Sequence, residues 1–166
     1  MGKYINFLKD TDLFFDLTKE QLEMIETLCD ERTYKKGELV FSENTREAEL
    51  YLVMDGLVEI LVNPNLVSSK PEKGSQPSVI AVLRRGQSFG EIALVDEGIR
   101  SASATAGEDR TQLLRIRRDQ FLSLCNSNPE LGYRVMYNLS MDLAQKIRNA
   151  DLQIREALLY QKGKSS

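Results

Sequence analysis

The residues best suited to chemistry lie together between Phe89 and Ala104. Gly90 lets the backbone approach a ligand closely because it has no Cβ atom. Glu91, when ionised, can only accept hydrogen bonds, so it suits the hydroxyl group of a sugar. Arg100 carries a permanent charge on a planar fork of donors that fits a phosphate. This combination predicts a site for one sugar and one anionic phosphate.

A short helical turn is expected directly after the glycine, because residues 92–94 are apolar. The free N–H groups that open such a turn point toward an anion. A solvated arginine and a glutamate that only caps the turn are the alternatives. We expect the ligand contacts to come from Phe89, Gly90, Glu91, Ile92, Ala93, Arg100, Ser101 and Ala102.

This segment resembles the phosphate-binding cassette of cyclic-nucleotide-binding domains. The family pattern is F-G-E-[LIM]-A-L, a variable loop, and then P-R-[AST]-A-[STV]. The match runs over Phe89–Leu94 and Arg100–Ser103, with Ile99 where proline is common. The resemblance implies a regulatory domain whose ligand is cyclic AMP, with cyclic GMP as the alternative. It implies no further cofactor.

The composition argues against several other classes of function. The sequence has no histidine, which excludes hydrolases with a histidine base and metal sites with histidine ligands. No pair of carboxylates stands out either, so we expect no catalytic residue, no metal site and no enzyme activity. The formal net charge of −3 argues against direct nucleic-acid binding.

The compartment follows from similar considerations. No apolar run approaches the length of a membrane span, and the N-terminus lacks the apolar core of a signal peptide. Cys29 and Cys125 fall in helical patterns, where buried thiols are expected rather than a disulfide. We therefore expect a cytoplasmic protein.

The predicted fold is mainly β with flanking helices. Residues 1–30 read as helical, with a capping box formed by Thr18 and Gln21. Residues 31–117, which include the cassette at 89–104, alternate short apolar runs with glycine turns. That alternation indicates an antiparallel β-roll, or jelly roll.

Particular turns can be predicted within the β-roll. Asp55-Gly56 separates two apolar runs and predicts a hairpin. Residues 63–78 predict a long surface loop. Asn44 lies where relatives often carry another glycine, and asparagine adopts the left-handed conformation more readily than most residues. We therefore expect a left-handed turn there.

Residues 118–160 predict helices, and 161–166 a tail. Pro129 suits the first position of a long helix. An apolar stripe follows, and at about thirty residues the helix would be roughly 45 Å long, which exceeds the width of a small domain. Its distal part is expected to pair with a second copy, although a helix folded back on its own barrel is the alternative. The stripe comprises Leu131, Val135, Leu139, Leu143, Ile147, Ile154 and Leu158.

In the catabolite-activator family, the equivalent helix forms the dimer interface, covers the base and leads into a helix-turn-helix domain. This sequence ends at Ser166, so we expect a sensor domain without that module. The resemblance places Lys146 and Asn149 near the base, and Leu83 and Ser103 are alternative contacts from the barrel wall. The family's hydroxyl pair on the helix is not preserved. An alternative function is a scaffold on the same fold with a non-functional pocket.

Overall fold

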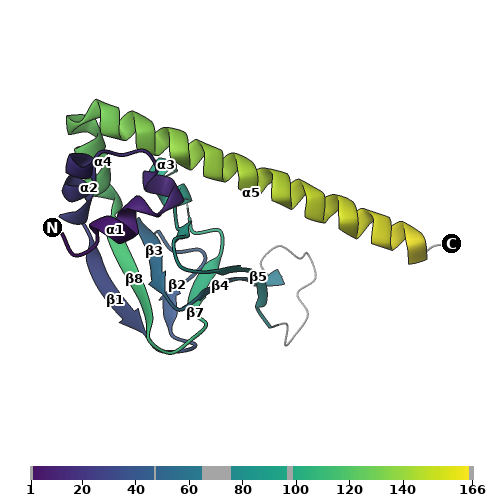
Figure 1. Cartoon of the computed structure of the whole chain (residues 1–166). Coiled ribbons are helices and arrows are strands. Elements are labelled where there is room, and N and C mark those ends of the chain that lie inside the picture. Colours follow the sequence, from purple (N-terminus) through teal and green to yellow (C-terminus); the bar gives the residue numbers. More distant parts are fainter. Residues whose placement is uncertain (1, 47, 65–75, 97–98, 165–166) are drawn as a thin grey trace.

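The computed structural model describes residues 2–46, 48–64, 76–96 and 99–164. They form two antiparallel four-stranded sheets, with short helices against one sheet and one long C-terminal helix that extends far beyond the body (Figure 1). The predicted class, an antiparallel β-roll with flanking helices, is confirmed.

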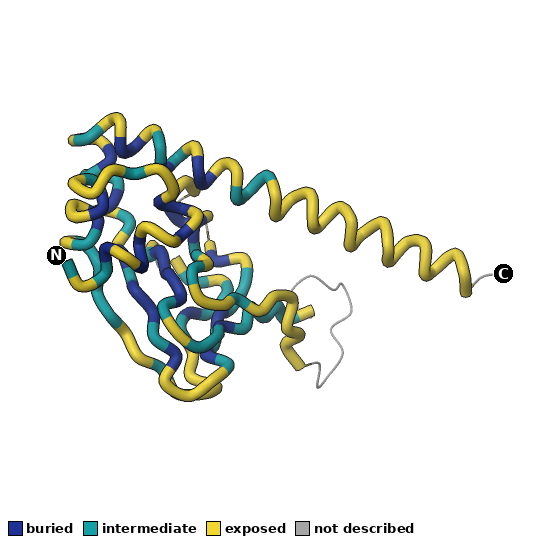
Figure 2. The backbone as a smooth tube through the Cα atoms, in the orientation of Figure 1, coloured by how far each residue is buried: buried dark blue, intermediate teal, exposed yellow. Residues whose placement is uncertain are grey.

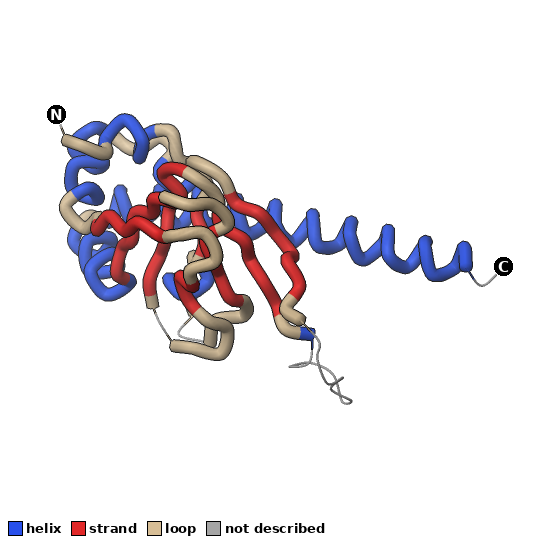
Figure 3. The backbone as a smooth tube through the Cα atoms, turned by 90° about the horizontal axis from the view of Figure 1, so that it is seen from below, coloured by secondary structure: helices blue, strands red, loops and turns tan. Residues whose placement is uncertain are grey.

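The strand order explains why the chain forms a roll. The first sheet has the order β1-β8-β3-β6 and the second has the order β2-β7-β4-β5, so strands from both ends of the β segment are neighbours in each sheet. Figure 3 shows the strands gathered in the body of the domain, with the long helix extending away from them. The strands of the first sheet, in that order, span Asp30–Tyr34, Thr111–Arg117, Glu49–Asp55 and Ser88–Phe89. Those of the second sheet span Leu39–Phe41, Ser103–Ala106, Val58–Val62 and Ser78–Leu83.

The hairpin predicted at Asp55-Gly56 is wrong. β3 pairs with β6 and β8, whereas β4 pairs with β5 and β7, so this turn carries the chain from one sheet to the other. Gly56 has a φ of 78°, which glycine adopts easily. The dipeptide therefore marks a turn, but the pairing is decided by strands distant in sequence. Residues 65–75 of the predicted surface loop lie outside the described residues, and the flanking strands β4 and β5 do pair.

Helices cover the outer face of the first sheet. α1 (Ile5–Lys9), the 3-10 helix η1 (Asp12–Phe14), α2 (Lys19–Glu26) and α4 (Arg118–Ser127) pack with the start of α5 on buried residues of β3 and β8. The capping box is confirmed, because the Thr18 hydroxyl accepts from the Gln21 amide (3.2 Å) while the Gln21 side chain accepts from the Thr18 amide (2.9 Å). A second core lies between the sheets and is rich in aromatic rings.

The long helix α5 spans Pro129–Lys164. Its start is anchored by the buried Leu131, Val135 and Leu139, whereas every described residue from 145 onward is exposed (Figure 2). The helix also continues past the predicted boundary at 160 into the expected tail. Gly163 does not end it, since one glycine costs a helix only about 1 kcal/mol.

Asn138 ties α5 to the N-terminal segment. It is 9% exposed, and its amide group donates to the carbonyls of Leu13 (3.0 Å) and Phe15 (2.8 Å). Asn138→Ala should lower the free energy of unfolding by about 1–3 kcal/mol, because two carbonyls lose their donor. Urea unfolding followed by circular dichroism measures this loss. Asn149→Ala on the exposed part of the same helix is the control, and equal midpoints for both variants would contradict the role of Asn138.

Candidate ligand-binding site

A cavity of about 320 Å³ lies between the second sheet, the cassette and α5. Its volume falls at the lower end of the range for small-molecule sites, which begins near 300 Å³. All of the predicted contact residues, 89–93 and 100–102, lie on its wall. The wall is mostly apolar, with a few charged side chains, as is typical of sites that bind organic ligands.

Gly90 brings the chain close to two other parts of the site. Its φ is 75°, and a Cβ atom there would lie 2.8 Å from the Glu49 carbonyl oxygen and 2.6 Å from Arg100 Nη1. The expected helical turn follows as α3 (Ile92–Val95), where the amides of Ala93 and Leu94 donate to the Gly90 and Glu91 carbonyls. Only glycine allows this approach without displacing the β3 backbone.

The guanidinium group of Arg100 is held on the cavity wall. The residue is 6% exposed, and it donates to the Glu49 carbonyl from Nη2 (2.7 Å) and to the Gly90 carbonyl from Nη1 (3.2 Å). Its Cζ atom also lies 4.1 Å from the centroid of the Phe41 ring. Two hydrogen bonds and a cation–π contact therefore fix its orientation, and the alternative of a solvated surface arginine is wrong.

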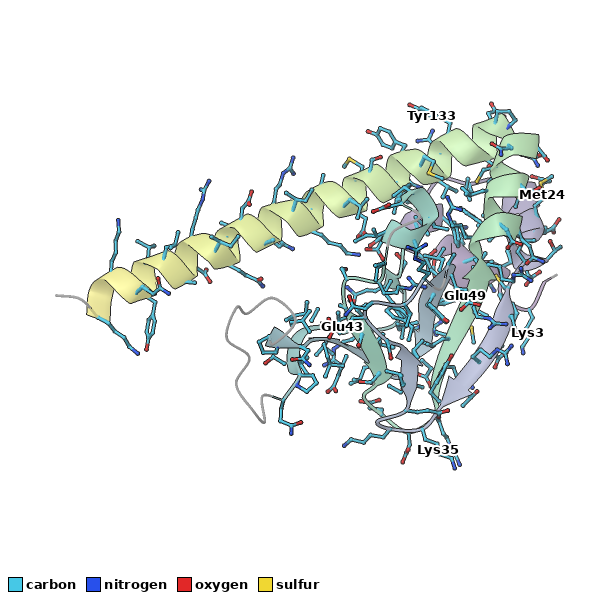
Figure 4. The ribbon with its side chains drawn as sticks, turned by 180° about the vertical axis from the view of Figure 1, so that it is seen from behind. Lys3, Met24, Lys35, Glu43, Glu49 and Tyr133 are labelled. Carbon is cyan, nitrogen blue, oxygen red and sulfur yellow. The ribbon has the colours of Figure 1, made fainter. Side chains whose placement is uncertain are left out.

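A cluster of three aromatic rings supports that arrangement, with Tyr51 and Phe89 stacked and Phe41 tilted against both. Phe41, Tyr51 and Phe89 have ring centroids 5.2–5.9 Å apart, within the range for favourable aromatic pairs. The Tyr51 hydroxyl donates to the Glu49 carboxylate at 2.6 Å. Burial and this hydrogen bond raise the pKa of Tyr51 above its usual value, so the hydroxyl remains a donor. Glu49 therefore links the aromatic cluster to the strand that holds Arg100; Figure 4 labels it within the body of the domain.

The turn at Asn44 holds the backbone of Arg100. Asn44 has a φ of 64°, which confirms the left-handed conformation expected there. Its amide donates to the Arg100 carbonyl (2.9 Å), and the Arg100 amide donates to the Thr45 carbonyl (2.9 Å). The sequence predicts the conformation of this turn but not its contact with Arg100, because residues 44–45 and Arg100 are distant along the chain.

Glu91 is buried and paired with a lysine from α5. It is 5% exposed, and its Oε1 atom accepts from Lys146 Nζ at 2.6 Å. Lys146 also forms an ion pair with Asp142 at 2.8 Å. Burial lowers the pKa of Lys146, but the attraction of Glu91 and the bonds to both carboxylates outweigh it, so the pKa lies above its usual value. The ammonium group of Lys146 therefore stays charged at neutral pH.

The sequence model of the family described as "Cyclic nucleotide-binding domain" matches residues 31–128. This match covers more than half of the chain and includes the whole cassette. The chain belongs to the cyclic nucleotide-binding domain family.

Individual members of the family are also similar to this chain. A protein named cyclic AMP receptor protein from Thermus thermophilus is 35% identical over 147 residues, which cover 89% of this chain and 62% of that protein. Human cGMP-dependent protein kinase 2 is 29% identical over 129 residues, which cover 78% of this chain and 16% of the kinase. The chain thus spans less than two thirds of the length of each of these two relatives.

Solved structures agree with the family fold. The crystal structure of Thermus thermophilus catabolite activator protein matches with a TM-score of 0.71 and 34% identity, over 87% of this chain and 62% of that chain. A cyclic nucleotide-binding domain from Methylobacillus flagellatus matches with a TM-score of 0.74 over 90% of this chain and 79% of that one. At 23% identity, the latter supports the fold alone.

The structure separates the four possible base contacts. Leu83 and Lys146 lie on the cavity wall. Ser103 and Asn149 do not line the cavity. Instead, the Ser103 hydroxyl accepts from the Glu43 amide (2.9 Å), and the exposed Asn149 accepts from Gln145 (3.1 Å). Lys146 reaches the cavity as expected, but its ammonium group bonds carboxylates.

Several wall residues were missed by the sequence analysis. Ile60 and Ala81 lie opposite each other in the β4–β5 register, and the alternation of side chains along these strands could have placed them on one face. Asp96 and Ile99 lie within the predicted cassette, whereas Phe41 and Ile80 belong to other strands and meet the cassette only when the roll closes. The missed residues are Phe41, Ile60, Ile80, Ala81, Asp96 and Ile99.

Three further expectations concern the rest of the molecule. Cys29 and Cys125 are not bridged, and burial raises the pKa of Cys29 to about 12. Among the described residues, no cluster of three or more histidine, cysteine, aspartate or glutamate side chains could hold a metal ion. No helix in the described part of the chain combines the length and the apolar character needed to span a membrane.

Proposed function

We propose that this chain is a regulatory domain that binds cyclic AMP. The observation that supports this most strongly is the convergence of a buried arginine and a buried glutamate on one cavity, beside the turn at Gly90. The relative named as a cyclic AMP receptor protein is 35% identical, whereas the kinase named for cyclic GMP is 29% identical. Cyclic AMP is therefore the first ligand to test, and cyclic GMP the second.

In the proposed complex, the cyclic phosphate lies against the backbone amides that open α3 and the guanidinium of Arg100. Glu91 accepts a hydrogen bond from the 2′-hydroxyl of the ribose, which is a donor that a carboxylate recognises. The base lies toward the apolar wall that contains Leu83, Ile60 and Ile80. Residues 89–93 and 100–102 supply the remaining contacts.

A thermal-shift screen with cyclic AMP, cyclic GMP and cyclic di-GMP tests this proposal. Ligand at a hundredfold excess over its dissociation constant stabilises a protein by about 2.7 kcal/mol. For a chain of this size, that corresponds to a rise in Tm of roughly 5–10 °C. We expect the rise with cyclic AMP. No rise with any of the three would favour the alternative, a scaffold with a non-functional pocket.

We further propose that α5 transmits the signal of ligand binding and forms a homodimer with α5 of a second copy. The domain would then regulate an effector rather than catalyse a reaction. The exposed apolar residues of its distal half support this, since Ile147, Ile154 and Leu158 are spaced by seven and four residues and are 63%, 58% and 55% exposed. This spacing places them on one helical face. Figure 4 shows the distal half of α5 with side chains projecting clear of the body.

The double variant Ile154→Asp and Leu158→Asp should dissociate such a dimer, because burying charges in an apolar helix seam is costly. Sedimentation velocity measures the change from dimer to monomer. Gln153→Asp, which adds a charge on the same exposed stretch, is the control and should remain dimeric. A wild-type chain that sediments as a monomer at high micromolar concentration would contradict the proposed dimer.

A further inference from the structure

The ion pair between Glu91 and Lys146 joins the cassette to the long helix. These residues are 55 positions apart and both line the cavity, where Lys146 Nζ donates to Glu91 Oε1 at 2.6 Å. The Glu91 side chain is 7% exposed and the Lys146 side chain is 41% exposed, so the pair joins a buried carboxylate to a partly exposed ammonium group. The contact lies at the start of the part of α5 in which every described residue is exposed.

Lys146 is compatible with a bound sugar. A carboxylate has two oxygens, and Lys146 bonds Oε1, so Oε2 can accept a hydroxyl group at the same time. Displacing the lysine would leave a buried charge without its counter-ion, which is strongly unfavourable. Sharing the carboxylate avoids that cost. The Lys146 ammonium group and the sugar hydroxyl should therefore bind the Glu91 carboxylate at the same time.

Lys146 is itself held by its own helix. Asp142, one turn earlier on α5, lies 2.8 Å from Nζ and its side chain is 30% exposed. This second carboxylate limits the rotamers of the lysine and directs its ammonium group toward the cassette. Two consecutive ion pairs, Asp142–Lys146 and Lys146–Glu91, thus connect α5 to Glu91 and fix the position of its carboxylate.

We propose that Lys146 is a positioning residue, which orients Glu91 toward the sugar hydroxyl and thereby couples ligand binding to the docking of α5. This inference rests on the proposed function. Because a coupling free energy is reciprocal, a ligand that needs a correctly oriented Glu91 also strengthens the contact of α5 with the cassette. The role differs from the base contact expected for Lys146 from the sequence.

A thermodynamic cycle between residue and ligand tests the proposal. Lys146→Met removes the charge and keeps most of the apolar stem. We expect it to weaken cyclic AMP binding by about tenfold or more, because a misoriented Glu91 would lose its charge-assisted hydrogen bond from the sugar hydroxyl. The same variant should change the affinity for 2′-deoxy cyclic AMP by less than about threefold, since that ligand lacks the hydroxyl and coupling appears only between interacting groups. Isothermal titration calorimetry gives all four constants.

Two variants serve as controls. Lys146→Arg retains the charge and should bind cyclic AMP within about threefold of the wild-type chain, since a guanidinium also pairs with carboxylates. Lys162→Met removes a charge from the far end of α5 and should leave both affinities unchanged. Equal losses for cyclic AMP and its 2′-deoxy analogue, or no loss for either, would overturn the role of Lys146. A wild-type chain that binds no cyclic nucleotide would instead refute the proposed function, and this inference with it.

Discussion

Replacing Arg100 with alanine is expected to weaken cyclic AMP binding by about thirtyfold to several thousandfold. This range corresponds to the roughly 2–5 kcal/mol lost when one member of a buried charge pair is removed. Arg100 is the cation that we assign to the cyclic phosphate, and its position is fixed by Glu49, Gly90 and the Phe41 ring. Calorimetric titration of the variant measures the effect.

Two further variants separate binding from folding. Arg100→Lys keeps the charge but loses the planar fork, so its affinity should lie between those of the wild-type chain and the alanine variant. Arg155→Ala removes an arginine from the exposed half of α5 and should bind normally. Circular dichroism checks that each variant is folded. Unchanged affinity in folded Arg100→Ala would show that this arginine does not bind the ligand.

The second large effect is expected for Gly90→Ala. A left-handed φ of 75° is strained for alanine, at a cost of about 1–3 kcal/mol. In addition, the new Cβ atom would lie 2.8 Å from the Glu49 carbonyl and 2.6 Å from Arg100 Nη1, so β3 or the arginine must shift. We expect a lower Tm and a loss of affinity of at least about tenfold, since misplacing the arginine weakens a charge-assisted contact.

Gly37→Ala is a matched control for this change. Gly37 has a similar φ of 81°, but a Cβ atom there would have no neighbour within 4 Å. The two variants should therefore lose comparable stability from the backbone, while only Gly90→Ala loses affinity. If Gly37→Ala weakened binding as much as Gly90→Ala, the close approach at Gly90 would not be the cause.

The cassette could be predicted from the sequence because its determinants are local. Gly90, Glu91 and Arg100 lie within one short segment, and their residue types state their chemistry directly. The positive φ at Gly90 and Asn44 follows from the same local preferences. The β-roll was predictable for a related reason, since many short apolar runs with close turns favour antiparallel sheets.

The long-range contacts could not be predicted in this way. Asp55-Gly56 is typical of a hairpin, yet the strands on either side belong to different sheets. The Asn44 turn holds Arg100, and Lys146 pairs with Glu91, although neither contact is suggested by sequence spacing. Each depends on how the roll closes and where α5 crosses it. Local patterns therefore identify the groups that recognise a ligand, and the tertiary fold decides which residues hold them in place.

Calorimetric titration of the wild-type chain with cyclic AMP measures directly whether the cavity binds a cyclic nucleotide. We expect saturable binding of one nucleotide per chain with a dissociation constant in the micromolar range or below, which corresponds to about −8 kcal/mol or stronger. Adenosine, which lacks the phosphate for Arg100, should bind at least about thirtyfold more weakly. If neither cyclic AMP nor cyclic GMP bound to the folded chain, the domain would not be a cyclic-nucleotide sensor.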